Sequence, residues 1–86
     1  MFSLDEVREF IIENFLFGDR ERFEPDLSFL ETGVIDSTGM LELVGFLEDR
    51  YKIQIKDEEF VPENLDSLHN IEGFLRRKLN GEDRSG

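Results

Sequence analysis

The sequence predicts an all-α fold, a small four-helix bundle with a long first loop and a short third helix. Apolar residues recur every three or four positions in three separate segments, as they do on the buried face of a helix. Only residues 53–55 alternate as a strand would, and one such run cannot form a sheet. The 86 residues, nine of them Phe, suffice for one small domain with one core, despite a net charge of -11 that would also suit a disordered chain.

The first helix is predicted to follow Ser3, because Ser3 and Glu6 are spaced as in a capping box. Gly18 is placed where a C-terminal glycine ends a helix. The apolar face of this helix is formed by Leu4, Val7, Phe10, Ile11 and Phe15.

Residues 19–35 are predicted to form a long connection that contains Pro25 and Gly33. A loop of this length is uncommon in a compact domain and often has a function. Its apolar residues imply that it packs across the bundle; they are Phe23, Leu27, Phe29, Leu30, Val34 and Ile35.

The second helix is predicted to start at Asp36 or Ser37 and to run to about Tyr51. A short helical turn is expected near residues 57–60, and Pro62 and Asn64 predict a break after it. The core-facing stripe of the second helix comprises Met40, Leu43, Val44, Leu47 and Tyr51.

The last helix is predicted to be capped by Asp66 or Ser67. Its final turns contain residues 76–78, three cations that suit the negative end of the helix dipole. Its apolar positions are Leu68, Ile71, Phe74, Leu75 and Leu79. We therefore expect one domain over residues 1–80 and a flexible tail over residues 81–86.

The charge distribution argues against nucleic acid as a partner, because phosphate binding needs clustered Lys and Arg. Residues 36–49 and 57–66 contain several acidic residues and no basic one. Such acidity either serves solubility or steers basic partner proteins toward this surface.

Other features predict a soluble, cytoplasmic protein, and we expect it to be a monomer. The chain has no Cys, and no apolar run approaches the roughly 20 residues that cross a membrane. Its N-terminus lacks the basic and then apolar pattern of a signal peptide. We expect no membrane insertion.

Few residues are suited to catalysis. The single His, His69, falls in the first turn of the last helix and is interpreted as exposed or capping. A zinc site lacks ligands, since the chain has no Cys and one His, and the sequence contains neither a calcium loop nor a glycine-rich phosphate loop. We expect neither catalytic residues nor a metal.

The start of the second helix has different chemistry. Asp36 can accept hydrogen bonds from the amides of the first helical turn, which leaves the Ser37 hydroxyl facing solvent. A helix N-terminus also favours a phosphodiester. Taken alone, however, an Asp-Ser pair at a helix start is usually only a cap.

The surrounding sequence strengthens the interpretation. Its motifs are Phe29-Leu30-Glu31-Thr32-Gly33, Asp36-Ser37, Leu41-Glu42-Leu43-Val44, Phe46-Leu47-Glu48, Tyr51-Lys52-Ile53-Gln54-Ile55 and Asp57-Glu58-Glu59. With these motifs, the stretch from about Leu27 to Leu75 resembles the acyl carrier protein family.

The resemblance implies that a phosphopantetheinyl transferase attaches 4'-phosphopantetheine from coenzyme A to Ser37. The arm would supply the thiol that this Cys-free chain lacks, and the cargo would be held as a thioester. Acyl or aminoacyl ligases and acyl-transfer enzymes with basic docking patches would be the partners.

A docking face for these partners is predicted on the second helix, where positions 38, 41, 45 and 48 share one side. The resemblance adds residues that commonly contact partners in the family. The predicted recognition set is Asp36, Thr38, Leu41, Glu42, Gly45, Glu48, Asp49, Asp57 and Glu58.

A second Asp-Ser pair competes for the role of attachment site. Asp66-Ser67-Leu68 matches the family's usual Asp-Ser-Leu more closely than residues 36–38 do. We reject it because no glycine turn precedes it, the following helix is not acidic, and it falls at the family's last structural helix. Asp66 and Ser67 are interpreted as capping residues.

Some positions depart from the family pattern. Thr38 replaces the usual leucine, and Gly45 lies where a bulky residue is common. Val34-Ile35 is more typical of specialised carriers, including D-alanyl carriers. An aminoacyl carrier, an unmodified acidic adaptor and a small hydrolase using Ser37 therefore remain as alternatives.

Overall fold

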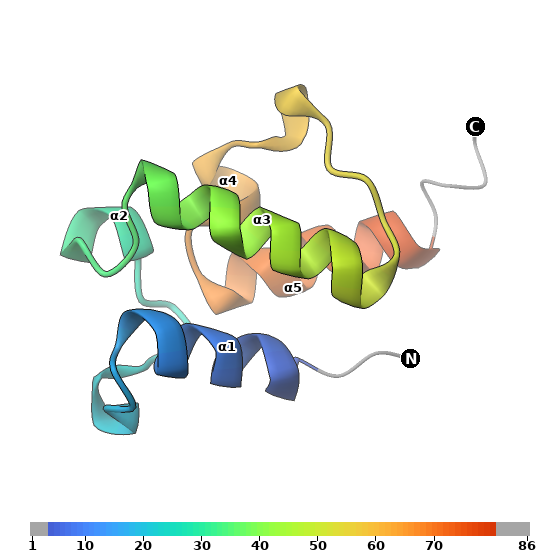
Figure 1. Ribbon diagram of the computed structural model, residues 1–86. Coiled ribbons are helices and arrows are strands. Elements are labelled where there is room, and N and C mark those ends of the chain that lie inside the picture. Colours follow the sequence, from blue (N-terminus) through green and yellow to red (C-terminus); the bar gives the residue numbers. More distant parts are fainter. Residues whose placement is uncertain (1–3, 81–86) are drawn as a thin grey trace.

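The computed structural model describes residues 4–80, and the side chains of residues 4–79. All regular secondary structure in this part of the chain is helical and no strand is present, so the predicted all-α class is confirmed (Figure 1). The helices are α1 (Asp5–Phe15), α2 (Phe29–Thr32), α3 (Ser37–Tyr51), α4 (Pro62–Leu65) and α5 (Leu68–Asn80), with 3₁₀ turns η1 (Arg20–Arg22) and η2 (Asp57–Glu59).

The three long helices pack around one apolar core. Helix α1 lies alongside α3, and α5 passes behind α3 in Figure 1. The segment 53–61 arches over the side of α3 that faces away from α1. Fully buried members of the core are Val7, Ile11, Phe29, Leu43, Leu47, Ile71 and Leu75. Burying each such side chain stabilises the fold by roughly 1.5–3 kcal/mol.

Helix α3 has the bounds that the sequence predicted. The Asp36 carboxylate accepts a hydrogen bond from the Gly39 amide at 2.8 Å, which caps the first turn. Lys52 ends the helix in the left-handed conformation, with φ of 57°.

Helix α1 differs at both ends from the prediction. It begins at Asp5 with Leu4 as its N-cap residue, and the expected cap Ser3 lies outside the described residues. It ends at Phe15, and Phe17 adopts a left-handed φ of 54° before Gly18 does. The predicted tail over residues 81–86 also lies outside the described residues.

The long connection is more structured than predicted. It contains η1 and the single-turn helix α2, which no periodic pattern indicated because a four-residue helix is too short to show one. The Ser28 hydroxyl accepts a hydrogen bond from the Glu31 amide at 3.2 Å, and Gly33 ends the turn with φ of 76°.

The predicted break at Pro62 and Asn64 is wrong. Pro62 is instead the first residue of α4. Proline is favoured at this position because the first amides of a helix have no partner within the helix. The turn expected near residues 57–60 is present as η2.

Asp66 and Ser67, the two residues before α5, have different hydrogen-bond partners. The Ser67 hydroxyl accepts a hydrogen bond from the Asn70 amide at 3.0 Å, so Ser67 caps α5 as predicted. Asp66 acts elsewhere, since its carboxylate accepts hydrogen bonds from the Leu30 amide at 2.9 Å and from the Ser28 hydroxyl. Asp66 thereby joins the start of α2 to the junction of α4 and α5.

Within residues 4–80, no helix is long and apolar enough to cross a membrane. The same residues contain no cluster of three or more acidic, His or Cys side chains that could hold a metal ion.

Candidate functional site

Ser37 is the first residue of α3 and is exposed to solvent. The chain that leads to it is fixed at two points. Ile35 is buried in the core, and its amide donates a hydrogen bond to the Phe29 carbonyl at 3.2 Å. Asp36 then caps the helix. Because its neighbours on the N-terminal side are both held, Ser37 has a defined place at the surface.

The helix end at Ser37 carries a partial positive charge from the aligned peptide dipoles of α3. Amides in the first turn of a helix can stabilise an anion placed there. The hydroxyl of Ser37 therefore lies where a phosphodiester is electrostatically favoured.

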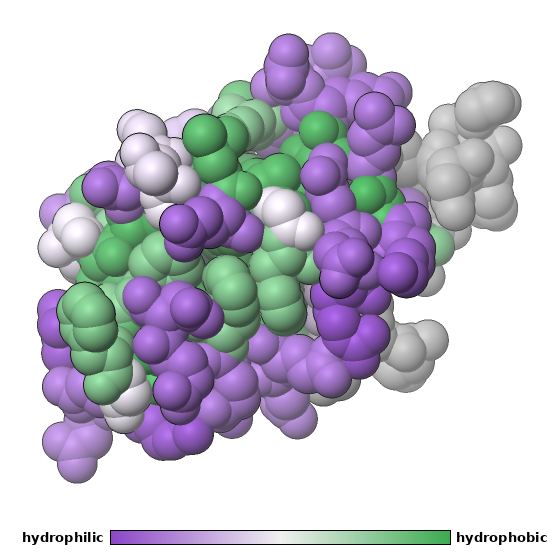
Figure 2. All heavy atoms as spheres, in the orientation of Figure 1, coloured by the Kyte–Doolittle hydropathy of each residue, from purple (hydrophilic) through white to green (hydrophobic). Residues whose placement is uncertain are grey.

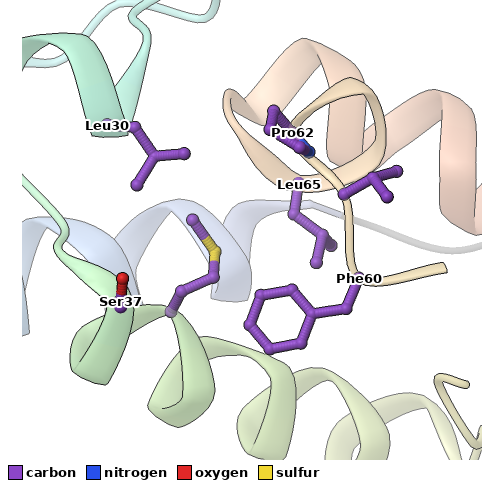
Figure 3. Close-up of a pocket in the computed structure, with 7 residues that line it drawn as sticks. Leu30, Ser37, Phe60, Pro62 and Leu65 are labelled. Carbon is purple, nitrogen blue, oxygen red and sulfur yellow. The ribbon is translucent and has the colours of Figure 1, made fainter. Parts of the chain in front are cut away.

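A hollow of about 120 Å³ opens beside Ser37. Among the described residues that line it, Ser37 is the single polar one, and the others are Leu30, Met40, Phe60, Val61, Pro62 and Leu65. In Figure 3 the hollow lies between α2, the start of α3 and the segment that leads into α4, with Ser37 at its edge. An apolar cavity of about 150 Å³ holds a whole benzene molecule, and this somewhat smaller hollow has room for part of a short apolar group.

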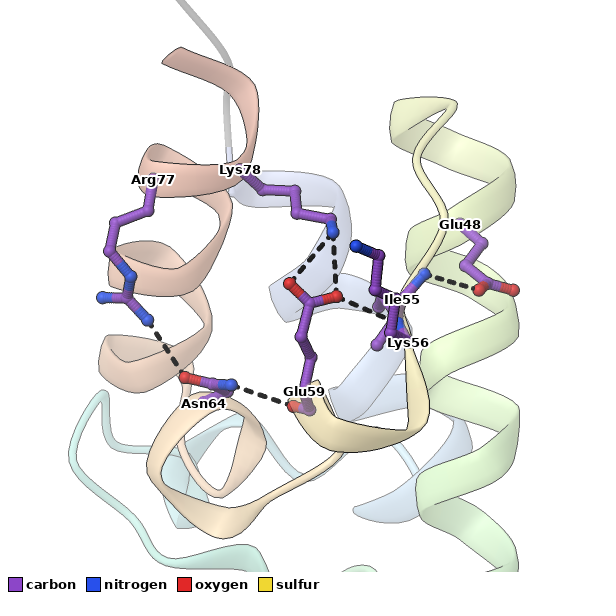
Figure 4. A network of polar contacts seen from close by, with 7 residues as sticks. All are labelled: Glu48, Ile55, Lys56, Glu59, Asn64, Arg77 and Lys78. Atoms are coloured by element: carbon purple, nitrogen blue, oxygen red, sulfur yellow. Dashed lines mark hydrogen bonds and ion pairs between the residues drawn. The ribbon is translucent and has the colours of Figure 1, made fainter. Parts of the chain in front are cut away.

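One wall of the hollow belongs to the segment 53–61, which is fastened to α3. The Glu48 side chain accepts a hydrogen bond from the Ile55 amide at 2.8 Å (Figure 4). Glu48 is partly buried, so this residue of the predicted recognition set also has a structural contact.

The same wall is fastened to α5 through Glu59. Its carboxylate accepts hydrogen bonds from Lys78 Nζ at 2.8 and 3.0 Å and from the Lys56 amide at 2.9 Å. The Asn64 side chain donates to the Glu59 carbonyl at 2.9 Å and accepts from Arg77 at 3.0 Å (Figure 4).

These contacts determine the charge of Glu59. Burial would raise the pKa of Glu59, but the hydrogen bonds from Lys78 and from the Lys56 amide outweigh it, and the pKa is lowered. Glu59 and Lys78 are therefore a charged pair at neutral pH, and they hold η2 against α5.

Most of the predicted docking face is exposed. On α3, Thr38, Leu41, Glu42, Gly45 and Asp49 are all exposed, and Leu41 retains 60% of its accessible surface. Asp36 is exposed at the helix start, and Asp57 and Glu58 are exposed on η2. The Glu48 contact connects α3 to the segment that carries η2.

Two exposed apolar residues near Ser37 were missing from the predicted recognition set. Leu30 on α2 is 42% exposed and Phe60 after η2 is 36% exposed, and both line the hollow. Leu30 had a partial signal in the sequence, because it follows Phe29 in the motif of residues 29–33 that carries the family resemblance. No pattern in the neighbouring sequence indicated Phe60, because its position beside Ser37 depends on the path of the segment 53–61 over α3.

The two glycines of α3 have different environments. A Cβ at Gly39 would lie 2.8 Å from Phe15 Cε1 and 3.0 Å from Ile35 Cγ2, so this glycine permits close packing of α3 on α1. A Cβ at Gly45 would meet no atom within 4 Å. Gly45 therefore leaves open space on the predicted docking face.

The serine of the rejected Asp-Ser pair is buried. Ser67 retains only 5% of its accessible surface and caps α5. His69 beside it is exposed, and its Nδ1 lies 2.9 Å from Asp26 Oδ1 in the loop before α2. This contact ties the loop to α5.

No family model matches this chain. It is 30% identical over 76 residues to the acyl carrier protein of Thermosynechococcus vestitus (strain NIES-2133 / IAM M-273 / BP-1), a match that covers 88% of this chain and 90% of that protein. It is 25% identical over 67 residues to the probable acyl carrier protein PigG of Serratia sp. (strain ATCC 39006), covering 78% and 77% of the two chains.

The chain belongs to the acyl carrier protein family. It is accordingly a carrier protein and not an enzyme.

Proposed function

We propose that this protein holds an acyl group as a thioester on a 4'-phosphopantetheine arm attached to Ser37, and presents it to partner enzymes. One observation carries the proposal: of the two Asp-Ser pairs, the one at Ser37 is exposed at a helix start, whereas Ser67 is buried. A modifying enzyme can reach only the first hydroxyl in the folded protein.

The residues around Ser37 fit the arm. The hydroxyl has open space in front of it, and the positive end of α3 stabilises the phosphodiester that would form there. Attachment would form a bond from Ser37 Oγ to the phosphorus of the pantetheine phosphate and break its bond to the adenosine bisphosphate of coenzyme A. The hydroxyl proton would leave to a base on the transferase.

The arm would contribute a thiol, which this chain does not have, because the sequence contains no Cys. The chain's own residues would position the attachment point. Tethering raises the effective concentration of the cargo at each partner's active site.

The hollow beside Ser37 favours an acyl cargo over an aminoacyl one. Its lining is apolar apart from Ser37, so a short hydrocarbon chain loses contact with water there. A cationic amine would have no carboxylate partner among these lining residues and would remain outside.

Partner enzymes would dock around Leu41, with the acidic residues of α3 and η2 facing their basic patches. Exposed charges of this kind mainly determine association rate and specificity. The expected partners are a phosphopantetheinyl transferase, an acyl ligase and acyl-transfer enzymes.

The test is incubation with coenzyme A and a broad-specificity phosphopantetheinyl transferase, followed by intact-mass analysis. We expect the mass of one arm on the wild type and on Ser67→Ala, and none on Ser37→Ala. Circular dichroism spectra of both variants show whether they are folded, since Ser67→Ala removes a helix cap.

An unmodified wild type would overturn the proposal in favour of an acidic adaptor. Ester hydrolysis by the unmodified protein that disappears in Ser37→Ala would instead indicate a hydrolase. An arm retained by Ser37→Ala would show that another residue is the attachment site.

A further inference from the structure

A second groove lies between α1 and α3. Its floor contains Phe10 and Phe46, and acidic residues of α1 form one side. Figure 2, drawn in the orientation of Figure 1, shows apolar surface on this face between polar residues. The groove has no part in the proposed attachment of the arm.

The floor of the groove is an aromatic pair. The rings of Phe10 and Phe46 stack with centroids 4.2 Å apart and planes inclined by 14°. Phe15 meets Phe10 edge to face at 5.9 Å. Phe10 and Phe46 are only half-buried, so part of the stacked pair remains open to solvent.

The acidic side of the groove has an excess of negative charge. Four carboxylates and one guanidinium are among its lining residues: Asp5, Glu6, Glu9, Glu13 and Arg50. Arg50 pairs with Glu6, and Arg20 pairs with Glu9 at 2.5 and 2.7 Å. Glu13 adds a further exposed carboxylate. Such a surface attracts cations placed over aromatic faces.

The groove and the hollow flank α3 on opposite sides. Phe46 follows Ser37 by nine residues. At about 100° per residue, nine residues bring the chain round by two and a half turns. Phe46 therefore projects from α3 on the side opposite Ser37, and an occupant of the groove would leave Ser37 and its hollow uncovered.

We propose that this α1–α3 groove docks a basic amphipathic segment of a partner protein. An apolar or aromatic side chain of that segment would cover the Phe10 and Phe46 rings, and its Lys or Arg side chains would face the exposed carboxylate of Glu13, since Arg20 already binds both carboxylate oxygens of Glu9. A segment of this kind complements both the apolar floor and the acidic side of the groove.

Charge complementarity disfavours the other occupants. A second copy of this chain also has a net charge of -11. Its basic cluster is engaged within the molecule, where Arg76 contacts Glu72, Arg77 contacts Asn64 and Lys78 contacts Glu59. The acidic side of the groove repels nucleic acid and anionic lipid.

The experiment is an NMR titration of the ¹⁵N-labelled protein with a synthetic helical peptide, with Leu and Phe on one face and Lys on the other. We expect amide shifts centred on Phe10, Glu13 and Phe46. A peptide with Glu in place of Lys should produce none. Ser37→Ala should bind as the wild type does, which separates this proposal from the attachment of the arm.

Matched variants test the site of binding. Glu13→Lys should weaken peptide binding at least fivefold. The control is Glu58→Lys on η2, which makes the same change in net charge at an exposed residue of the predicted docking face. Its loss of affinity should be less than half that of Glu13→Lys. Phe46→Leu should also weaken binding. Thermal melts of each variant show whether it is folded.

Shifts centred on Leu41 and Glu58, or equal effects of the two charge reversals, would overturn the proposal, as would an absence of shifts. Dimers in sedimentation analysis that show the same shifts without peptide would replace the partner segment by a second copy.

Discussion

The carboxylate of Glu59 and the ammonium group of Lys78 form a largely buried ion pair, with side chains only 13% and 10% exposed. The pair joins η2 to α5 and so fixes the segment that forms one wall of the hollow beside Ser37.

Removing one partner of this pair should destabilise the protein. Glu59→Gln replaces the carboxylate that contacts Lys78 by a neutral amide, and we expect a loss of about 1–3 kcal/mol in the free energy of unfolding at pH 7. Urea denaturation measures it. The control is Glu72→Gln, which removes the exposed pair with Arg76 and should cost less than about 1 kcal/mol. Equal losses in the two variants would contradict the structural role of Glu59.

The pair also predicts a pH dependence. The pKa of Glu59 is lower in the folded protein than its ordinary value of 4.5, so its contribution to stability is complete above that value. The contribution should be lost as pH falls from about 4.5 through the folded pKa. Urea denaturation from pH 7 to pH 3 should therefore show a smaller loss for Glu59→Gln than for the wild type. Parallel curves would exclude Glu59 as a source of the dependence.

The two glycines of α3 should respond oppositely to alanine. Gly39→Ala places a methyl group against Phe15 and Ile35, and we expect a net destabilisation of about 1–3 kcal/mol from overpacking. Gly45→Ala enters open space and should stabilise by about 0.5–1 kcal/mol through helix propensity. Thermal denaturation compares them, and a stabilised Gly39→Ala would show that α1 does not pack closely there.

Asp36 should have separable roles as cap and as charge. Asp36→Ala removes the acceptor of the Gly39 amide and should lower stability by about 0.5–2 kcal/mol. Asp36→Asn can keep the cap, so it should unfold nearly as the wild type does. If both variants are modified by the transferase equally fast, the Asp36 charge has no part in recognition. We expect Asp36→Asn to be modified more slowly.

The hollow predicts how cargo affects the bundle. In the arm-bearing protein, a hexanoyl cargo should shift the amide signals of Met40, Val61 and Leu65, because these residues line the hollow. A D-alanyl cargo should leave them unchanged. The opposite pattern in ¹⁵N NMR spectra would favour the aminoacyl carrier over the acyl carrier.

The parts of the structure that sequence predicts well are those determined by neighbouring residues. Helix α3 could be placed because Asp36 accepts a hydrogen bond from the amide three residues later and because the apolar stripe runs for about three turns. The exposed position of Ser37 followed from the same local signal. The carrier function needed the family resemblance as well.

The parts that sequence missed depend on distant residues. Helix α2 begins where Asp66, which lies 36 residues from Leu30, accepts hydrogen bonds from that segment. The hollow combines Leu30, Met40 and Phe60 from three separate segments. Pro62 was misread because a proline that ends one helix and a proline that begins another look alike without their surroundings.

Under the proposed function, the burial of Ser67 means that tertiary structure, rather than a short motif, selects which of the two serines carries the arm. In an unfolded chain both Asp-Ser pairs lie open and differ little. A protein molecule modified at both serines would therefore indicate that the transferase acted on the chain before the chain had folded.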